Sequence, residues 1–394
     1  MAAPVNPWMG TPGGLTRARA LGIEVAGEPG PCNAITDVPG VTVGYATLVS
    51  GGGEGVEANA VRTGVTVVLP RPSESLGAAC AAGLYSSNGN GEMTGSHWIE
   101  ESGSLWTPIG ITNTHAVGTV HRGIVNWLVD THPTMAAQWM LPVVAETWDG
   151  YLNDINGDHV THDHVRHALQ GASSGPIEEG SVGGGTGMNC YGFKGGTGSA
   201  SRVVGFGGET YTLGVLLQCN FGSRRELRWN GVALGRELDV ACPMESEDWF
   251  ARDVAAPPGA GSVIAVVATD APLMPGQAKA LARRVPFGLA RTGTTGSHFS
   301  GDIFVAFSTA NAGALDSHFP QRPARSATLS RLSFVPWGYM DPFFEAVVQC
   351  VEEAVWNALI ANEDMTGRRG HFSPALPHGQ LRELLEMHEG RASR

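Results

Sequence analysis

A serine follows a glycine at the head of a strongly apolar run, at Gly261-Ser262. Residues 263–268 are apolar without alternation, which predicts a strand buried on both faces and a Ser262 hydroxyl that is held rigidly. Gly261 leaves its carbonyl open to close approach, and the Pro-Pro-Gly loop at 257–259 can bend sharply just upstream.

This arrangement is a plausible place for the chain to cut itself. If Ser262 attacked the Gly261 carbonyl, the peptide bond would become an ester, and hydrolysis would leave Ser262 with a free α-amine. Ser262 would then supply both the nucleophile, which is its hydroxyl, and the base, which is its α-amine. A Gly-Ser pair ahead of a strand is more often only a loop that enters a sheet, so the interpretation depends on partners elsewhere in the chain.

Other polar residues stand at the ends of apolar segments. Asn220 follows the β-prone segment 210–218, where an asparagine either turns the chain or presents its amide to a developing oxyanion. Glu146 follows a short apolar stretch and is expected at the edge of a core. Ser300 and Asp302 end a polar loop that begins at residue 292 and precedes a predicted strand at 303–308.

Two conspicuous motifs have simpler interpretations. His159, His162, His164 and His167 have spacings that could gather metal ligands, but the interleaved charges favour the solvated face of a surface helix. The glycine-rich segment 181–198 does not fit a nucleotide-binding motif, because Lys194 is followed by glycine. We expect a loop whose glycines permit positive φ and close backbone packing against a neighbouring site.

Hydrophobic patterns predict the elements that would position these residues. The segment 76–84 fits either a strand or a loop, and residues 223–261 read as a long polar connection. Residues 1–17 are rich in proline and glycine and are expected to form an arm or a disordered lead-in. A strand is predicted at 61–69 and helices at 117–129, 275–284 and 343–361.

Composition restricts the function classes. The 394 residues include 42% hydrophobic and 16% charged residues, which fits a compact globule with a sizeable core. A formal net charge of -12 argues against a nucleic-acid partner. No apolar run is long enough to span a membrane, and no signal peptide is visible. Six scattered cysteines without a CxxC pair are expected to be free thiols, so a reducing, cytoplasmic setting is predicted.

Together these passages resemble the DmpA-type aminopeptidase family, which includes L-aminopeptidase/D-esterases and β-peptidyl aminopeptidases. The similarity extends over nearly the whole chain after the N-terminal arm. The segments that carry it are 33–44, 88–95, 146–150, 183–194, Asn220, 261–273 and 300–311.

The resemblance implies an α/β (α+β) fold, a four-layer α/β/β/α sandwich. After the arm at 1–17 we expect one catalytic domain at 18–394, and the resemblance implies that this domain cuts itself between Gly261 and Ser262 into 1–261 and 262–394. The processed heterodimers are expected to assemble into a homo-oligomer. No metal or cofactor is required.

The resemblance also implies the roles of the polar residues. Ser262 matches the nucleophile, and Asn220 matches the oxyanion donor. Ser300 and Asp302 match a serine and an acid beside the nucleophile, and Glu146 matches an acid near the substrate's amino group. The base stays open between the α-amine, with a reference pKa of about 7.7 to 8.0, and a relay through Ser300 and Asp302.

The predicted function is therefore a self-processing serine aminopeptidase that acts on short peptides, amides or esters through an acyl-enzyme. One alternative is acyl transfer of the ornithine acetyltransferase type, although those enzymes cut before a threonine. An alternative from another class is a non-catalytic small-molecule binding protein. The preference for L-, D- or β-amino acyl groups and the subunit count stay open.

Overall fold

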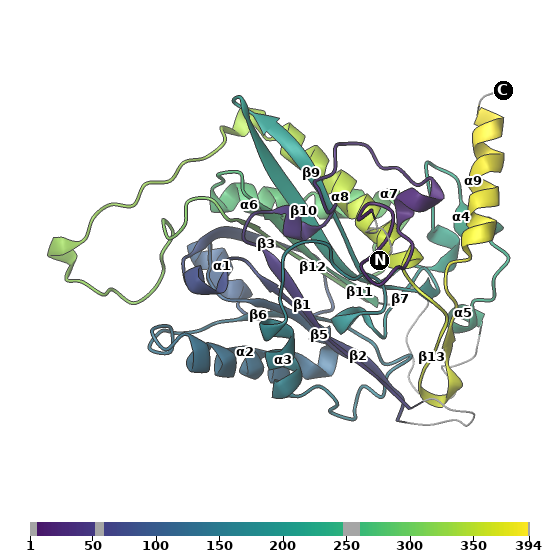
Figure 1. Cartoon of the computed structure of the whole chain (residues 1–394), viewed down its shortest axis with the longest axis horizontal. Helices are drawn as coiled ribbons and strands as arrows, with labels where there is room; N and C mark the ends of the chain where they lie inside the picture. The colour runs from purple at the N-terminus through teal and green to yellow at the C-terminus, as the bar shows by residue number, and fades with distance from the viewer. Residues whose placement is uncertain (1–5, 52–58, 247–260, 393–394) are drawn as a thin grey trace, which may run out of the picture.

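Two β-sheets stack face to face at the centre of the molecule (Figure 1). The computed structural model describes residues 6–51, 59–246 and 261–392. One sheet has four strands in the order β1-β2-β5-β6, at Thr42–Ser50, Val61–Leu69, Ile109–Asn113 and Val143–Thr147. The other has six strands in the order β4-β3-β12-β11-β10-β9, at Ser104–Leu105, Cys80–Gly89, Ser300–Ser308, Gly261–Thr269, Glu209–Asn220 and Gly196–Phe206.

Helices cover the outer face of each sheet. Helices α2 (Val117–Thr131) and α3 (His162–Gln170) pack on the four-stranded sheet. Helices α6 (Pro275–Ala282) and α8 (Asp341–Ile360) pack on the six-stranded sheet, and α7 (Val285–Arg291) packs on α8. The order helix, sheet, sheet, helix confirms the predicted four-layer sandwich. The remaining elements are α1 Ser96–Ser102, α4 Leu234–Glu237, α5 Pro243–Ser246, α9 His378–Ala392, β7 Asn189–Cys190, β8 Phe193–Lys194, β13 Met365–Thr366 and β14 Phe372–Ser373.

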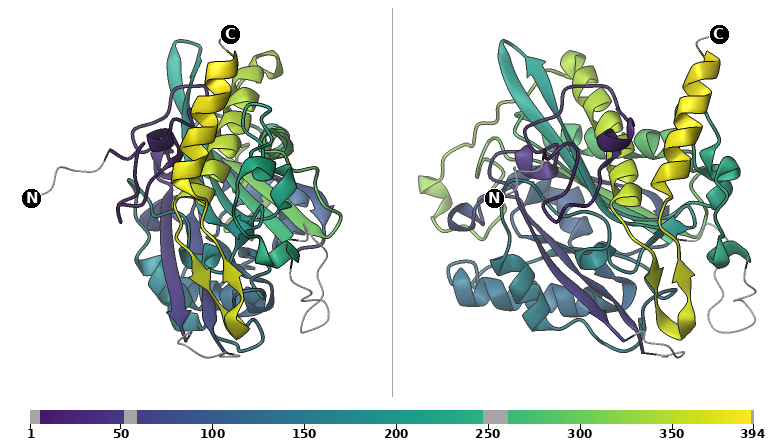
Figure 2. Two further views of the ribbon diagram at one scale, coloured as in Figure 1. Left: turned by 90° about the vertical axis from the view of Figure 1, so that its right-hand side faces the viewer. Right: turned by 45° about the vertical axis from the view of Figure 1, so that its right-hand side comes forward.

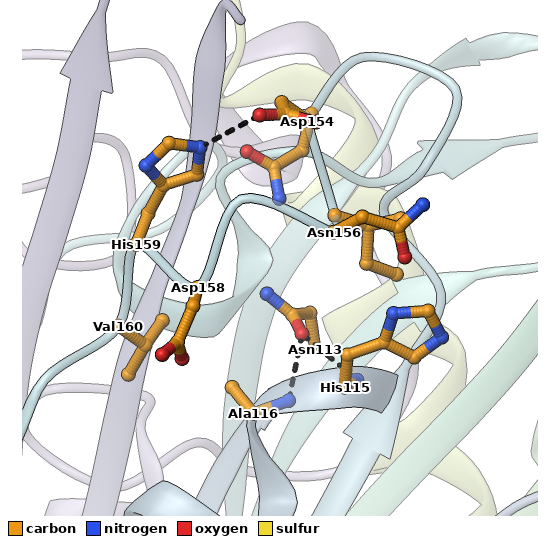
Figure 3. A pocket seen from close by; sticks show the side chains of 10 residues that line it. Asn113, His115, Ala116, Asp154, Asn156, Asp158, His159 and Val160 are labelled. Atoms are coloured by element: carbon orange, nitrogen blue, oxygen red, sulfur yellow. Dashed lines mark hydrogen bonds and ion pairs between the residues drawn. The ribbon is translucent and has the colours of Figure 1, made fainter.

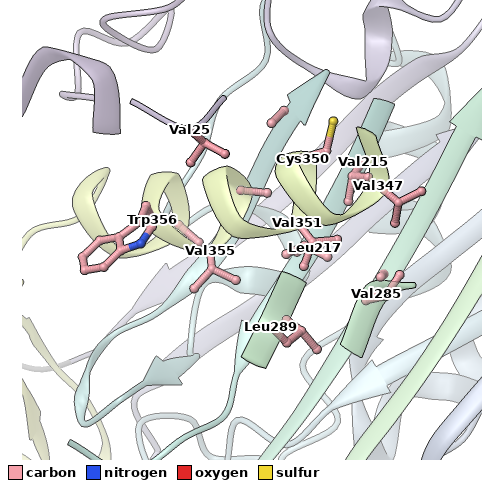
Figure 4. Packing of buried hydrophobic residues seen from close by; sticks show 14 of the residues in the cluster. Val25, Val215, Leu217, Val285, Leu289, Val347, Cys350, Val351, Val355 and Trp356 are labelled. Carbon is pink, nitrogen blue, oxygen red and sulfur yellow. The ribbon is translucent and has the colours of Figure 1, made fainter. Parts of the chain in front are cut away.

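Apolar side chains fill the spaces between these layers. Between the sheets, Ile264 and Val266 of β11 meet Ile109 and Ile111 of β5. On the other face of β11, Val263 and its neighbours join the larger core under α8, where Val347 and Val351 lie against β10 (Figure 4). Strand β11 is therefore buried on both faces, as its sequence predicts.

The hydrophobic patterns located most elements closely. Strand β2 and helices α2, α6 and α8 lie within two residues of the predicted ranges at either end. The undecided segment 76–84 becomes a turn followed by β3. Strand β12 begins at Ser300, three residues before the predicted start at 303, because parallel pairing with β11 extends to that residue. Ser300 and Asp302 are therefore strand residues rather than loop residues.

From residue 6 onward, the N-terminal segment is anchored to the body. Arg17 is buried and forms an ion pair with Glu179 at 2.6 Å, and it also donates to the Ser199 carbonyl of β9. At the other end of the chain, the hairpin β13/β14 and helix α9 stand along one side of the sandwich (Figure 2). No helix in the described part of the chain is long and apolar enough to cross a membrane.

The histidine-rich segment forms a surface helix. Helix α3 begins at His162 and buries Val165, Ala168 and Leu169, which leaves its polar side chains toward solvent. This confirms the surface-helix interpretation. Within residues 6–51, 59–246 and 261–392, no group of three His, Cys, Asp or Glu side chains is arranged to hold a metal ion.

Candidate active site

Ser262 and Asn220 lie directly opposite each other on neighbouring strands. Asn220 ends β10, Ser262 is the second residue of β11, and the antiparallel register pairs them. Residues that pair in this way place their side chains on the same face of the sheet. That face is the one between the two sheets, because Ile264, two residues after Ser262, lies in the inter-sheet core.

Hydrogen bonds fix the orientation of the Asn220 amide. The backbone N–H of Asn189 donates to Asn220 Oδ1 at 2.9 Å, and Asn220 Nδ2 donates to the Trp148 carbonyl at 2.8 Å. Neither of these bonds uses the second Nδ2 proton. A rigid amide opposite a serine hydroxyl is the geometry that an oxyanion donor requires.

Ser300 and Asp302 form a buried pair at the head of β12. The Ser300 hydroxyl donates to Asp302 Oδ1 at 2.6 Å, and the Asn88 amide donates to Oδ2 at 2.9 Å. Burial raises the pKa of Asp302, whereas the hydrogen bonds from Ser300, Asn88 and the Val263 backbone N–H oppose that rise.

The register sets this pair beside the peptide bond rather than beside the Ser262 hydroxyl. Ser300 pairs with Gly261 and Asp302 with Val263, so Gly301 is the partner of Ser262. Because side chains alternate along a strand, Ser300 and Asp302 lie on the face opposite to Ser262. Their strand partners, Gly261 and Val263, are the residues on either side of Ser262.

Gly261 occupies a position that only glycine fits. A Cβ atom added there would lie 1.9 Å from the carbonyl oxygen of Asn220 and 3.1 Å from the Phe221 Cα. Both obstacles are backbone atoms, which cannot move aside without disrupting the β10/β11 pairing. The end of β10 therefore lies directly against the residue before Ser262.

Glu146 lies in β6, close to the head of β12. Its Oε1 accepts the Glu92 backbone N–H at 3.1 Å, and its Oε2 accepts the Thr114 hydroxyl. Burial raises the pKa of Glu146, although these hydrogen bonds oppose the rise. A Cβ atom added at Gly91 would lie 3.2 Å from Glu146 Oε1 and 3.1 Å from the Gly301 Cα, so only a thin layer of backbone separates this carboxylate from the strand partner of Ser262.

The structure thus gathers the five residues that the sequence singles out at one end of the two sheets. Their exposed fractions lie between 2% and 6%. Sequence reasoning missed the side chains that hold them, namely Asn88 and Thr114. Asn88 belongs to a polar segment that already stood out, whereas no local pattern links Thr114 to Glu146.

A polar pocket of about 250 Å³ opens near this site without including any of the five residues (Figure 3). His115 and Asn113 line one side of it, and His159, paired with Asp154 at 3.1 Å, lines the other. Its link to the site is Thr114, the residue before His115, whose hydroxyl binds Glu146. The pocket therefore lies behind the carboxylate rather than in front of Ser262.

Asp149 is a buried acid next to the Trp148 carbonyl that accepts from Asn220. Its Oδ1 accepts from Asn153 at 3.0 Å, and burial raises its pKa from 3.8 to about 7. Between these two pH values the folded chain binds one proton more than the unfolded chain. This contribution to stability is therefore lost as the pH rises from about 4 to about 7, at about 1.4 kcal/mol per pH unit.

We expect Asp149→Asn, which cannot titrate, to gain stability relative to its parent as the pH rises from about 5 to about 7.5. Urea unfolding of Ser262→Ala chains with and without Asp149→Asn measures this difference on an unprocessed polypeptide. Asp130→Asn, which removes an exposed aspartate paired with Arg166, is the control. A free-energy difference that is equal at both pH values would contradict the titration of Asp149.

Comparisons with known proteins agree with this geometry. A family model described as Peptidase family S58 matches residues 33–373. The β-peptidyl aminopeptidase BapA of Sphingosinicella microcystinivorans is 49% identical over 374 residues, which cover 94% of this chain and 92% of that protein.

Solved structures match over almost the full length as well. The L-aminopeptidase D-Ala-esterase/amidase from Ochrobactrum anthropi, described as a new variant among the Ntn hydrolase fold, has a TM-score of 0.85 and 45% identity, and the match covers 95% of this chain and 99% of that one. A β-aminopeptidase from Burkholderia sp. has a TM-score of 0.83 and 42% identity, with 94% and 99% coverage.

These matches confirm the resemblance that the sequence motifs indicated. They give no support to the ornithine acetyltransferase alternative, and membership of a peptidase family argues against a non-catalytic binding protein. The chain belongs to peptidase family S58 and is an aminopeptidase of the N-terminal-nucleophile serine type.

Proposed function

We propose that Ser262 attacks the carbonyl of a substrate's N-terminal residue and forms an acyl-enzyme that water then hydrolyses. The observation that carries this proposal is the β10/β11 register, which sets the Asn220 amide opposite Ser262 on the face between the sheets. In this scheme Asn220 donates to the oxyanion and Glu146 pairs with the substrate's ammonium group. A buried carboxylate near the nucleophile favours substrates with a free N-terminus, which is what an aminopeptidase requires.

We further propose that the chain becomes active by cutting itself between Gly261 and Ser262, which yields 1–261 and 262–394. The close approach of Gly261 to the end of β10 supports a tightly held peptide at this position. Residues 247–260, which precede the cut, lie outside the described residues. Because β10 comes from the first piece and β11 from the second, the cut leaves the six-stranded sheet as one unit.

Of the two candidate bases, we favour the α-amine that the cut would create on Ser262. Ser300 pairs with Gly261 across β11 and β12, so its hydroxyl lies beside the position of the new amine. Asp302 accepts from Ser300, which orients that hydroxyl. The Ser300 and Asp302 pair would then hold the amine in place, whereas a direct relay from Ser262 would have to cross the sheet.

We propose that β-aminoacyl groups are among the accepted substrates. The support is the similarity to the β-peptidyl aminopeptidase of S. microcystinivorans and to the β-aminopeptidase of Burkholderia sp.. The chain is also similar to an L-aminopeptidase D-Ala-esterase/amidase. Substrates with α-aminoacyl groups are therefore the ones against which β-aminoacyl substrates should be compared. Measuring kcat/KM for a β-aminoacyl p-nitroanilide and for its α-L and α-D counterparts tests this, and no turnover of the β-compound would refute it.

Assembly into a homo-oligomer and a reducing, cytoplasmic setting also remain proposals. The part of the chain around the short helical turn Ala324–Ser326 extends away from the body (Figure 1). Phe319, Leu329 and Phe334, which lie on either side of this turn in the sequence, are exposed, which favours burial against another copy. The cysteines are free thiols, which fits a reducing compartment. Light scattering of the processed enzyme tests the assembly.

Glu146→Gln is expected to raise KM for aminoacyl p-nitroanilides about 10-fold to 100-fold and to change kcat much less. The reason is the loss of a charged hydrogen bond to the substrate ammonium, which is worth about 1.5–3 kcal/mol. Because burial raises the pKa of Glu146, KM of the wild type should also rise as the pH falls, and that dependence should disappear in the variant.

The matched control is Glu92→Gln. Glu92 is an exposed acid whose backbone, rather than its carboxylate, binds Glu146. We expect this control to keep KM within about twofold of the wild type, since it loses no charged contact with the substrate. Equal effects of the two substitutions would mean that general negative charge, not Glu146, attracts the substrate.

A further inference from the structure

Lys194 is a fully buried lysine in the strand β8. Its exposed fraction is 0%, and among the described residues no carboxylate oxygen lies within ion-pair distance of its Nζ. Instead, Nζ donates to the carbonyl of Met188 at 2.9 Å and to the carbonyl of Gly195 at 2.8 Å. Burial lowers the pKa of Lys194 to about 7. Burying an ammonium group without a carboxylate is costly, so its contacts are expected to serve a purpose.

The contact with Met188 connects Lys194 to the site. The Met188 carbonyl and the Asn189 N–H belong to the same peptide group, and that N–H donates to Asn220 Oδ1 at 2.9 Å. A continuous series of hydrogen bonds therefore runs from Lys194 Nζ through this peptide to the Asn220 amide. Hydrogen bonds in such a series polarise one another, most strongly in a buried setting.

We propose that Lys194 is a positioning residue for the oxyanion donor: it holds and polarises the Met188–Asn189 peptide, which in turn orients the Asn220 amide toward the oxyanion. The inference rests on the proposed role of Asn220. It gives the glycine-rich segment 181–198 a function, because the segment brings a lysine and a backbone N–H behind the site. Lys194 itself does not touch the substrate.

A double-mutant cycle tests the proposal on fully processed enzyme with an aminoacyl p-nitroanilide. Lys194→Met removes the donors with little change in volume. We expect it to lower kcat about tenfold, less than removal of the donor itself, and to keep KM within about twofold. In the Asn220→Ala background the same substitution should lower kcat by less than about twofold, since the amide on which it acts is gone.

The matched control is Asn362→Ala. The Asn362 amide donates to the carbonyls of Lys194 and Gly195 but not to the Met188–Asn189 peptide. We expect Asn362→Ala to lower the melting temperature, because the hydrogen bonds that hold the backbone at Lys194 and Gly195 are lost. Its kcat should stay within about twofold of the wild type. If Lys194→Met does not fold, Lys194→Gln replaces it in the double-mutant cycle with Asn220→Ala. The same changes in kcat and KM are then expected.

The outcomes separate the inference from the proposed function. If Asn220→Ala lowers kcat but Lys194→Met acts equally in both backgrounds, or acts on KM, the connection from Lys194 to Asn220 is refuted and the oxyanion role stands. If Asn220→Ala leaves kcat unchanged, both are refuted. A tenfold loss that depends on Asn220 supports the inference.

Discussion

Ser262→Ala is expected to leave the purified protein as one polypeptide on a denaturing gel and to abolish peptide and amide hydrolysis. The wild type should instead give pieces of 261 and 133 residues, the second being 394 minus 261. Both effects follow from the loss of one hydroxyl, which attacks first its own chain and later the substrate. We expect kcat to fall about 10⁶-fold, as when another serine hydrolase loses its nucleophile.

Ser262→Thr is the matched variant, because it keeps a hydroxyl at the same position. We expect partial or slow cleavage and measurable turnover, limited by the added methyl group in a site that is only 2% exposed. A wild-type chain that stays whole, or a Ser262→Ala chain that splits as well as the wild type, would refute self-processing. Loss of turnover without loss of cleavage would mean that different groups perform the two reactions.

The processed enzyme should keep the size and the melting behaviour of one domain. Strands β11 and β12 follow the cut, whereas β10 and β3, which flank them in the sheet, precede it. Each piece therefore leaves an open sheet edge without the other, and the inter-sheet core takes residues from both. With this arrangement, the proposed cut would create an N-terminus in the interior without dividing the fold.

The sequence predicted well the elements whose pattern is set locally. All nine residues of β2 are buried, and the β-prone valines and threonines at 61–69 predict such a strand. Helix α8 spans 20 residues with a buried apolar side, and its periodicity located it to within two residues. In both cases the sequence pattern reflects which residues of the segment are buried. It can therefore be interpreted without knowing which other element packs against the segment.

The partners of the site residues depend on contacts between distant segments, which no local pattern reports. Thr114 binds a glutamate 32 positions away, and Asn88 binds an aspartate 214 positions away. The start of β12 was misplaced for the same reason, because polar residues at 300–302 read as a loop until parallel pairing with β11 satisfies their backbone. Lys194 was noted only for failing a nucleotide-binding motif, since its contacts are to carbonyls that every residue carries.

Asn220→Ala is expected to lower kcat about 10²-fold to 10³-fold and to leave KM nearly unchanged. The amide opposite Ser262 would meet negative charge only as the tetrahedral intermediate forms, so its loss destabilises the transition state and not the bound substrate. Steady-state kinetics of the processed variant measures the two parameters. Self-cleavage should slow as well, because in the proposed cut the Gly261 carbonyl would pass through the same kind of intermediate.

Asn220→Asp sharpens the test, because it preserves the shape and the oxygen that accepts from Asn189. It replaces the donor to the Trp148 carbonyl by a second oxygen and sets a carboxylate where negative charge develops. We therefore expect a kcat no higher than that of Asn220→Ala, despite the smaller change in volume. A near-normal kcat for the aspartate variant would mean that residue 220 only fills space. A rise in KM without a fall in kcat would instead move Asn220 to the substrate-binding role that Glu146 is proposed to have.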